Sequence, residues 1–136
     1  MLPEFERAAR QGDVRRLEEQ LDSGAEIGSR DRYGQTALML AAHAGQLDAV
    51  ESLVRRGADL NVTAKYGLSA LMLAIVAGHE AVACALVRAG TDLAIRGTGA
   101  PGFADKTALD LAAARDMKAV CDEIAARTQG TPGRGS

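Results

Sequence analysis

The sequence predicts an all-α solenoid in which short helix–turn–helix units stack side by side and are joined by β-hairpin-like loops. The first observation is a step of 33 residues within each of two glycine series: Gly12, Gly45, Gly78, and Gly24, Gly57, Gly90. The second is a repeated stretch, since YGQTALMLAAHAG at residues 33–45 returns as YGLSALMLAIVAG at residues 66–78. Self-similarity at a period of roughly 20–50 residues is typical of repeat proteins, whose units bury their apolar faces against one another.

Each unit is expected to contain two short helices, as the second copy illustrates. Thr36 is placed to cap the first helix, and Gly45 ends it because glycine adopts a left-handed conformation at little cost. The second helix, LDAVESLVRR, leads to Gly57 and a polar turn. Both helices have apolar residues at i, i+3, i+4 spacing: Leu38, Ala41 and Ala42, then Val50, Leu53 and Val54. Neither helix is long enough to be stable alone, so neighbouring copies must cover these faces.

Four units are expected, in one domain over residues 1–127. Their approximate bounds are 1–30, 31–63, 64–96 and 97–127. The fourth unit starts at Thr107, 38 residues after Ser69, and the five extra residues fall around GTGAPG at 97–102. The remaining TQGTPGRGS, residues 128–136, is small and polar and is expected to be a disordered tail.

The two end units are expected to act as caps, with charged residues facing water. They carry Glu4, Glu6, Arg7 and Arg10 in the first unit, and Lys118, Asp122, Glu123 and Arg127 in the last. Terminal repeats need a polar outer face because no further repeat covers them.

Composition restricts the classes of function. The 136 residues include 47% apolar and 25% charged residues, and the formal net charge of −2 argues against nucleic acid as the main partner. No apolar run approaches the roughly 20 residues of a membrane span, and the N-terminus does not resemble a secretory signal. Two cysteines form no disulfide framework, so a cytoplasmic location is expected. Cys121 is expected in the core and Cys84 at an exposed helix position.

Residues for catalysis or cofactor binding do not converge in this sequence. His43 and His79 lie in different units with no carboxylate at H-E-x-x-H spacing, which argues against a zinc site. The GTGAPG stretch lacks the G-K-[ST] ending of a phosphate-binding loop. We therefore expect no enzyme activity, no cofactor and no metal, and a structural role for His79 beside the turn between helices.

Two sequence motifs carry a family resemblance. Thr36-Ala37-Leu38-Met39-Leu40-Ala41-Ala42-His43-Ala44-Gly45-Gln46 and residues 69–79 follow the pattern T-P-L-H-x-A-A-x-x-G-H, and Gly57-Ala58-Asp59-Leu60-Asn61 follows G-A-D-x-N. About residues 3–127 thus resemble the ankyrin repeat family. The signature proline is replaced by Ala37, Ala70 and Ala108, and the signature histidine by Met39, Met72 and Asp110.

The resemblance implies a non-enzymatic protein–protein interaction module, such as a scaffold, adaptor or inhibitor. Ankyrin proteins bind partners through a concave face made by the hairpins and first helices, and the chain alone is expected to be a monomer with no membrane partner. The family's variable positions correspond here to the expected partner-binding residues: Arg10, Gln11, Arg30, Arg32, Tyr33, Gln35, His43, Ala44, Thr63, Lys65, Tyr66, Leu68, Val76, Ala77, Arg96, Phe103 and Lys106.

The hairpin edge also has an unusual composition. Three of the four aromatic residues, Tyr33, Tyr66 and Phe103, fall in hairpin segments, where they either contact a partner or pack on the next hairpin. The charges there sum to +3: five cations, Arg30, Arg32, Lys65, Arg96 and Lys106, against Asp31 and Asp105. A basic edge favours a partner with an acidic surface, with nucleic acid or another acidic ligand as the alternative, or it is simply solvated.

Overall fold

The computed structural model describes residues 1–129, within which eight α-helices form four pairs. The pairs are α1 (Pro3–Gln11) with α2 (Val14–Asp22), α3 (Ala37–Ala44) with α4 (Leu47–Arg55), α5 (Ala70–Ala77) with α6 (Glu80–Ala89), and α7 (Ala108–Ala114) with α8 (Lys118–Gln129). A 3-10 turn, η1 (Lys65–Gly67), lies in the second hairpin. The predicted all-α solenoid is confirmed.

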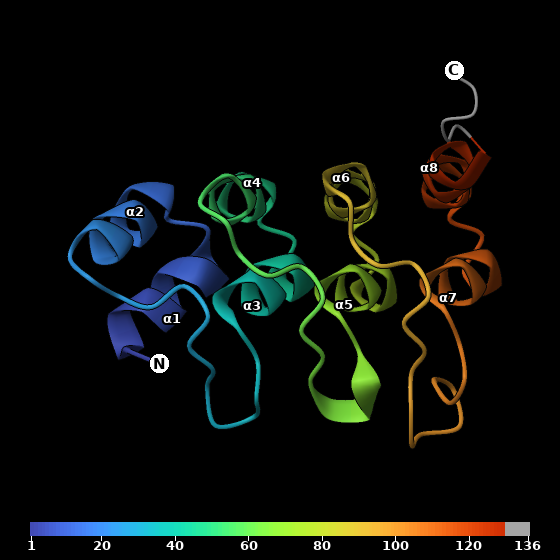
Figure 1. Cartoon of the computed structure of the whole chain (residues 1–136), viewed down its shortest axis with the longest axis horizontal. Helices are drawn as coiled ribbons and strands as arrows, with labels where there is room; N and C mark the ends of the chain where they lie inside the picture. The colour runs from blue at the N-terminus through green and yellow to red at the C-terminus, as the bar shows by residue number, and fades with distance from the viewer. Residues whose placement is uncertain (130–136) are drawn as a thin grey trace.

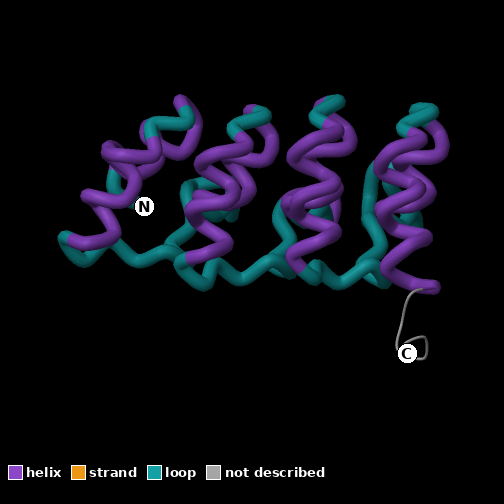
Figure 2. The backbone as a smooth tube through the Cα atoms, turned by 90° about the horizontal axis from the view of Figure 1, so that it is seen from above, coloured by secondary structure: helices purple, strands orange, loops and turns teal. Residues whose placement is uncertain are grey.

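The helices form two layers. The first helices of the pairs, α1, α3, α5 and α7, make one row, and the second helices make the other (Figure 1). The loops between pairs extend from the first-helix row, on the side away from the second helices. Seen from above, the four pairs stand as parallel columns (Figure 2). Contacts run between α1, α3, α5 and α7 in order along one layer, and between α2, α4, α6 and α8 along the other.

Side-chain caps and left-handed glycines set the helix ends, as predicted for the second copy. The Thr36 and Ser69 hydroxyls accept hydrogen bonds from the backbone N–H groups of Met39 and Met72, both at 3.3 Å. Gly45 ends α3 with φ 76°. In the fourth pair the equivalent position is Asp116, with φ 56°, so the left-handed turn is kept without glycine. This conformation is uncommon but tolerated for Asp.

Polar side chains connect the second helices at the two outer interfaces. Between α2 and α4, the Arg56 guanidinium lies 2.6 Å from the Asp22 carboxylate, and the Ser52 hydroxyl donates to Glu18 at 2.8 Å. Between α6 and α8, Arg88 pairs with Glu123 at 3.1 Å. These contacts fix the spacing of the second helices over both outer interfaces.

The predicted C-terminal cap is partly wrong. Glu123 pairs with Arg88 on α6, and Arg127 donates to the backbone carbonyl of Thr91, so both side chains face the preceding pair. Only Lys118 and Asp122 remain as an exposed pair, 3.0 Å apart. Helix α8 also continues through Gln129, beyond the predicted domain end at residue 127. Residues 130–136 of the predicted tail lie outside the described residues.

The two cysteines differ from their predicted environments. Cys84 is buried, because α8 packs against α6 and covers it, whereas Cys121 is only partly buried. Cys121 matches Val50, which the next pair covers, but no element within residues 1–129 packs on the outer side of α8. Burial at this position of a repeat depends on the following repeat, and α8 has no following repeat within residues 1–129.

The third hairpin is tied to the second. The backbone N–H of Thr98 donates to the carbonyl of Tyr66 at 2.7 Å, and the Tyr66 and Phe103 rings lie 5.5 Å apart between centroids. Both contacts involve the segment that contains the five extra residues. The insertion therefore holds two hairpins together.

Candidate functional site

A hollow on the hairpin side of the first-helix layer gathers several of the predicted partner-binding residues. Its volume is ≈ 310 Å³.

 Two other depressions, one beside α6 and one beside α8, have volumes of ≈ 320 Å³ and ≈ 420 Å³, so size alone does not distinguish this hollow. Its lining does: Arg10 from α1, Tyr33 and Gln35 from the first hairpin, Leu40, His43 and Ala44 from α3, and Leu73 from α5. Five of these seven residues were predicted to contact a partner.

The floor and rim of this hollow, which we call the first-hairpin hollow, differ in chemistry. Leu40 is buried and Leu73 is half-buried, so they supply an apolar floor. Arg10, Tyr33 and His43 are exposed and supply polar groups at the rim. An apolar floor with a few polar groups around it is the usual composition of a recognition pocket. The arrangement suits one apolar or aromatic side chain whose neighbours form hydrogen bonds.

The Asp31 side chain holds the hairpin backbone at the rim of the hollow. Its side chain is 6% exposed, and its Oδ1 accepts hydrogen bonds from the backbone N–H groups of Tyr33 and Gln35, both at 2.9 Å. Its Oδ2 is buried, has no hydrogen-bond partner among the described residues, and lies 3.8 Å from Nη2 of Arg10. Asp31 thus fixes the hairpin backbone and attracts the Arg10 guanidinium to it.

Arg10 is held between two carboxylates. In addition to Asp31, it forms an ion pair with Glu6 on its own helix at 3.0 Å. The backbone carbonyl of Arg10 accepts a hydrogen bond from the Gln46 side chain at 3.0 Å, which joins the end of α1 to the next pair. The rim cation therefore has a defined position before any partner is bound.

The hairpin aromatics fall into two environments. Tyr33 is 62% exposed, and its own neighbour Arg32 lies over its ring at 5.5 Å. Tyr66 packs on Phe103 of the next hairpin, which is one of the two alternatives stated from the sequence, while Lys65 lies 5.0 Å from its ring centroid. Tyr33 is therefore the hairpin aromatic with most surface open to a partner.

The five cations of the predicted basic edge, Arg30, Arg32, Lys65, Arg96 and Lys106, are all exposed. Arg96 is partly neutralised within its hairpin, since its Nη1 donates to the Asp105 carbonyl at 2.8 Å and lies 3.7 Å from the Asp105 carboxylate. Asp31 is turned inward, so it contributes little negative charge to the surface.

The remaining predicted contact residues lie apart from the hollow. Leu68 is 5% exposed and belongs to the core, so its prediction as a contact residue is wrong. It was chosen because its position varies in the family, but here its side chain is buried in the hydrophobic core. Thr63, Val76 and Ala77 are half-buried, and Gln11 is exposed at the end of α1.

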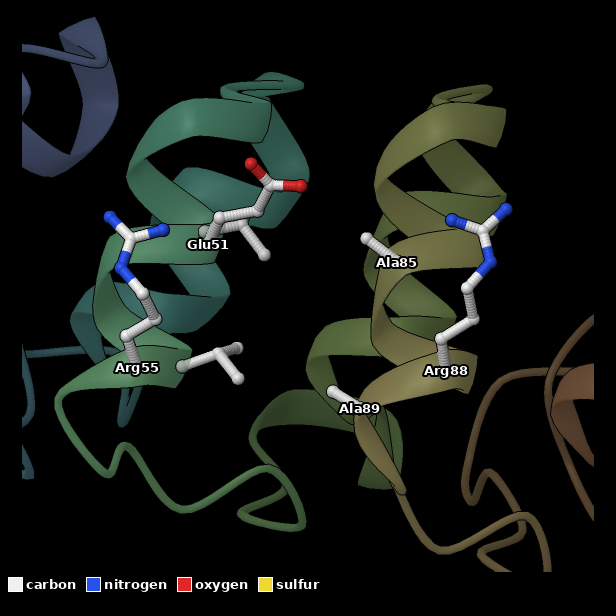
Figure 3. A pocket seen from close by; sticks show the side chains of 7 residues that line it. Glu51, Arg55, Ala85, Arg88 and Ala89 are labelled. Atoms are coloured by element: carbon white, nitrogen blue, oxygen red, sulfur yellow. The ribbon is translucent and has the colours of Figure 1, made fainter.

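A second depression, on the second-helix layer, was not predicted. It lies between α4 and α6, has a volume of ≈ 380 Å³, and is lined by Val50, Glu51, Val54, Arg55, Ala85, Arg88 and Ala89. Figure 3 shows Glu51 and Arg55 on one wall, with Ala85 and Ala89 on the other. Ala81, Ala85 and Ala89 recur every four residues, and this stripe of small residues was the available sequence signal. Side-chain hydrogen bonds and ion pairs link α2 with α4 and α6 with α8, whereas within residues 1–129 none links α4 with α6.

Reactive groups do not converge in the part of the chain that the structure describes. No group of three His, Cys, Asp or Glu residues could hold a metal ion there. Burial, together with the nearby Glu123 carboxylate, raises the pKa of the Cys84 thiol, which disfavours the nucleophilic thiolate. The His79 ring bonds to the His43 carbonyl at 3.1 Å, so it has the structural role expected of it.

Across residues 1–129, the structure contains no helix with the length and apolar character needed to span a membrane.

The stacked helix pairs, with their hairpins along one side, define the class as an α-helical repeat protein. A family model described as ankyrin repeats matches three copies over residues 5–97, which is more than half of the chain. The chain belongs to the ankyrin repeat family. The pair α7 and α8 lies beyond the matched residues and adds a fourth helix pair to the stack. A search of curated proteins gave no match.

Membership fixes the general role. Ankyrin repeats are generally protein–protein interaction modules, and the family is typically non-enzymatic. The fold alone does not identify the partner, which depends on the residues that each member displays.

Proposed function

We propose that this protein is a cytoplasmic scaffold, adaptor or inhibitor that binds a partner protein at the first-hairpin hollow. The observation that carries the proposal is the convergence of Arg10, Tyr33 and His43, from three separate segments, around the apolar floor formed by Leu40 and Leu73. A partner side chain that enters this hollow removes apolar surface from water, which contributes about 1.5–3 kcal/mol for a fully buried large side chain.

The rim supplies orientation. Arg10 is held by Glu6 and Asp31, and the Asp31 side chain also orders the backbone that presents Tyr33. A preorganised rim lowers the entropy lost on binding. Tyr33 offers a large amphipathic surface with only two side-chain torsions, which is characteristic of residues that dominate binding energy.

The basic edge gives the proposal its partner chemistry. Exposed Arg30, Arg32 and Lys65 lie in the first two hairpins, and they favour an acidic protein surface through faster, salt-dependent association. Nucleic acid is the alternative ligand for the same charges. A nucleic-acid complex predicts binding to oligonucleotides whose affinity falls steeply with salt.

Affinity capture from source cells tests the proposal when three baits are compared. The wild-type chain is expected to capture a partner that Tyr33→Ala captures about tenfold more weakly or not at all. Arg15→Ala is the matched control, because the Arg15 side chain is 90% exposed on α2, in the other layer. Equal capture by all three baits contradicts the proposed site. Loss of capture after nuclease treatment favours nucleic acid instead.

A further inference from the structure

The two ends of the stack differ in the polarity of the residues that they expose. Each internal pair has positions that face the following pair, and these are covered in the first three copies: Phe5, Ala9 and Leu17; Leu38, Ala42 and Val50; Leu71, Ile75 and Ala83. All nine residues are at most 1% exposed. The same positions in the fourth copy are Leu109, Ala113 and Cys121. These three residues form the outer surface of α7 and α8, which we call the C-terminal end face.

The C-terminal end face keeps its apolar residues although no element of residues 1–129 covers it. Leu109 is 44% exposed, Ala113 is exposed and Cys121 is half-buried. A depression of ≈ 420 Å³ beside α8 lies on the same face and is lined by Ala113, Asp116, Met117, Lys118 and Cys121. None of the three inherited apolar positions carries a charge, whereas a terminal repeat normally has a polar outer side.

At the N-terminal end of the stack, charged residues occupy the positions that are apolar in the second copy. Positions that face the preceding pair in the second copy are Ala37, Leu40 and Ala49, and all three are buried. Their counterparts in the first copy are Glu4, Arg7 and Arg16, and all three are exposed. Glu4 and Arg16 also pair with each other at 3.3 Å. One end of the molecule is thus polar, and the other displays the surface that elsewhere binds a repeat.

We propose that the C-terminal end face binds the same face of a second copy of this chain and forms a twofold-symmetric dimer. A head-to-tail stack would press this apolar face against Glu4, Arg7 and Arg16, and removing those charges from water without new partners is unfavourable. Two copies of the C-terminal end face instead bury Leu109 and Ala113 against apolar atoms. An isologous contact of this kind closes at two subunits.

The charges around the face are compatible with self-association. Asp116 and Lys118 line the depression on this face, and the Lys118–Asp122 pair offers both signs 3.0 Å apart. In a twofold arrangement contacts are reciprocal, so Lys118 of each copy can pair with Asp122 of the other. The face lies at the opposite end of the stack from α1, so the first-hairpin hollow stays open in the dimer (Figure 1). The proposed dimer differs from the monomer expected from the sequence.

Sedimentation equilibrium of the full chain tests the proposal from roughly 5 to 500 μM, a range that includes the dissociation constants of weak dimers. The wild-type mass is expected to rise to twice the monomer mass and stop there. Leu109→Glu and, independently, Ala113→Glu are expected to raise the dissociation constant at least about tenfold, with unchanged circular dichroism. Leu2→Glu, at the exposed N-terminal end, is the matched control and should dimerise as the wild type does.

Thiol alkylation supplies a second readout that needs no variant. Cys121 lies on the face, so its alkylation should slow as the wild-type concentration rises, while Cys84 is buried at every concentration. A monomer at all concentrations overturns the proposal. A mass that grows beyond the dimer, or a loss of assembly in Leu2→Glu, indicates head-to-tail stacking and overturns the twofold contact. Protection of Cys121 in dilute monomer means that the same chain covers the face, which also overturns it.

Discussion

Nε2 of His79 lies 3.1 Å from the backbone carbonyl oxygen of His43, one repeat earlier in the stack. The carboxamide of Gln46 makes the same kind of contact one repeat before, 3.0 Å from the carbonyl oxygen of Arg10. Both side chains directly follow a left-handed glycine and reach back across the interface between pairs. A hydrogen bond at this position is therefore a recurring device that joins one first helix to the next pair.

Replacing His79 tests the strength of this link. We expect His79→Ala to lower the free energy of unfolding by about 1–3 kcal/mol, since the carbonyl loses its partner and ring packing is lost. His79→Gln is expected to keep most of the stability, because Gln46 shows that a carboxamide makes the contact from this position. Urea unfolding at equilibrium measures both. Equal losses in the two variants would contradict a specific hydrogen bond.

Substitutions at two glycines with similar backbone angles distinguish the cost of backbone strain from the cost of a steric clash. Gly45 and Gly78 both end a first helix, with φ of 76° and 86°. A methyl group on Gly78 meets no atom within 4 Å, whereas one on Gly45 would lie 2.7 Å from the His79 ring. Gly78→Ala is expected to cost about 1–2 kcal/mol from the left-handed conformation alone, and Gly45→Ala more. Adding His79→Ala should reduce the excess cost of Gly45→Ala, and an unchanged excess would show that the ring is not the obstacle.

Asp110 should make the fourth pair sensitive to acid. Hydrogen bonds from Thr107, chiefly from its backbone N–H at 3.0 Å, lower the pKa of the Asp110 carboxyl below its ordinary value of 3.8. A lowered folded-state pKa means that the stabilisation is complete above the ordinary pKa and is lost as pH falls through the lowered one. Asp110→Asn keeps an acceptor without the charge. The stability difference between wild type and this variant should shrink between neutral pH and about pH 3, and a constant difference would refute the charge effect.

The tie between the second and third hairpins can be measured with a double-mutant cycle. Tyr66→Ala and Phe103→Ala are expected to be non-additive by about 0.5–1.5 kcal/mol, because their rings pack at 5.5 Å. Tyr33→Ala with Phe103→Ala is the matched control, and these two should add. Thermal unfolding of the variants reports the coupling. Additivity of Tyr66 and Phe103 would show that the insertion does not join the hairpins.

The periodic features of this fold were predictable because residues close together in the sequence determine them. Thr36 as a cap and Gly45 as a stop act within one helical turn, so their roles follow from residue type and spacing. The 33-residue step then places equivalent helices side by side without further information.

Burial at the ends and at single positions was not predictable in the same way. The burial of Cys84 and Cys121 depends on which neighbouring helix lies over them, and Leu68 is buried although its position follows a hairpin. Glu123 and Arg127 are charged residues of the last helix, which the sequence predicts to face solvent, but in the structure they bind Arg88 on α6 and the carbonyl of Thr91 in the loop after it. The first-hairpin hollow required the relative positions of three segments, although most of its rim residues had been identified one by one.

Site-specific photocrosslinking in source cells tests the central claim most directly. A photoreactive aromatic residue replaces Tyr33 at the first-hairpin hollow or, in a separate variant, Arg55 at the depression between α4 and α6. Our account predicts one discrete crosslinked protein from position 33, which excess unlabelled wild-type chain competes away, and none from position 55. A competed crosslink from position 55 with none from position 33 would place the binding surface on the second-helix layer and contradict the account.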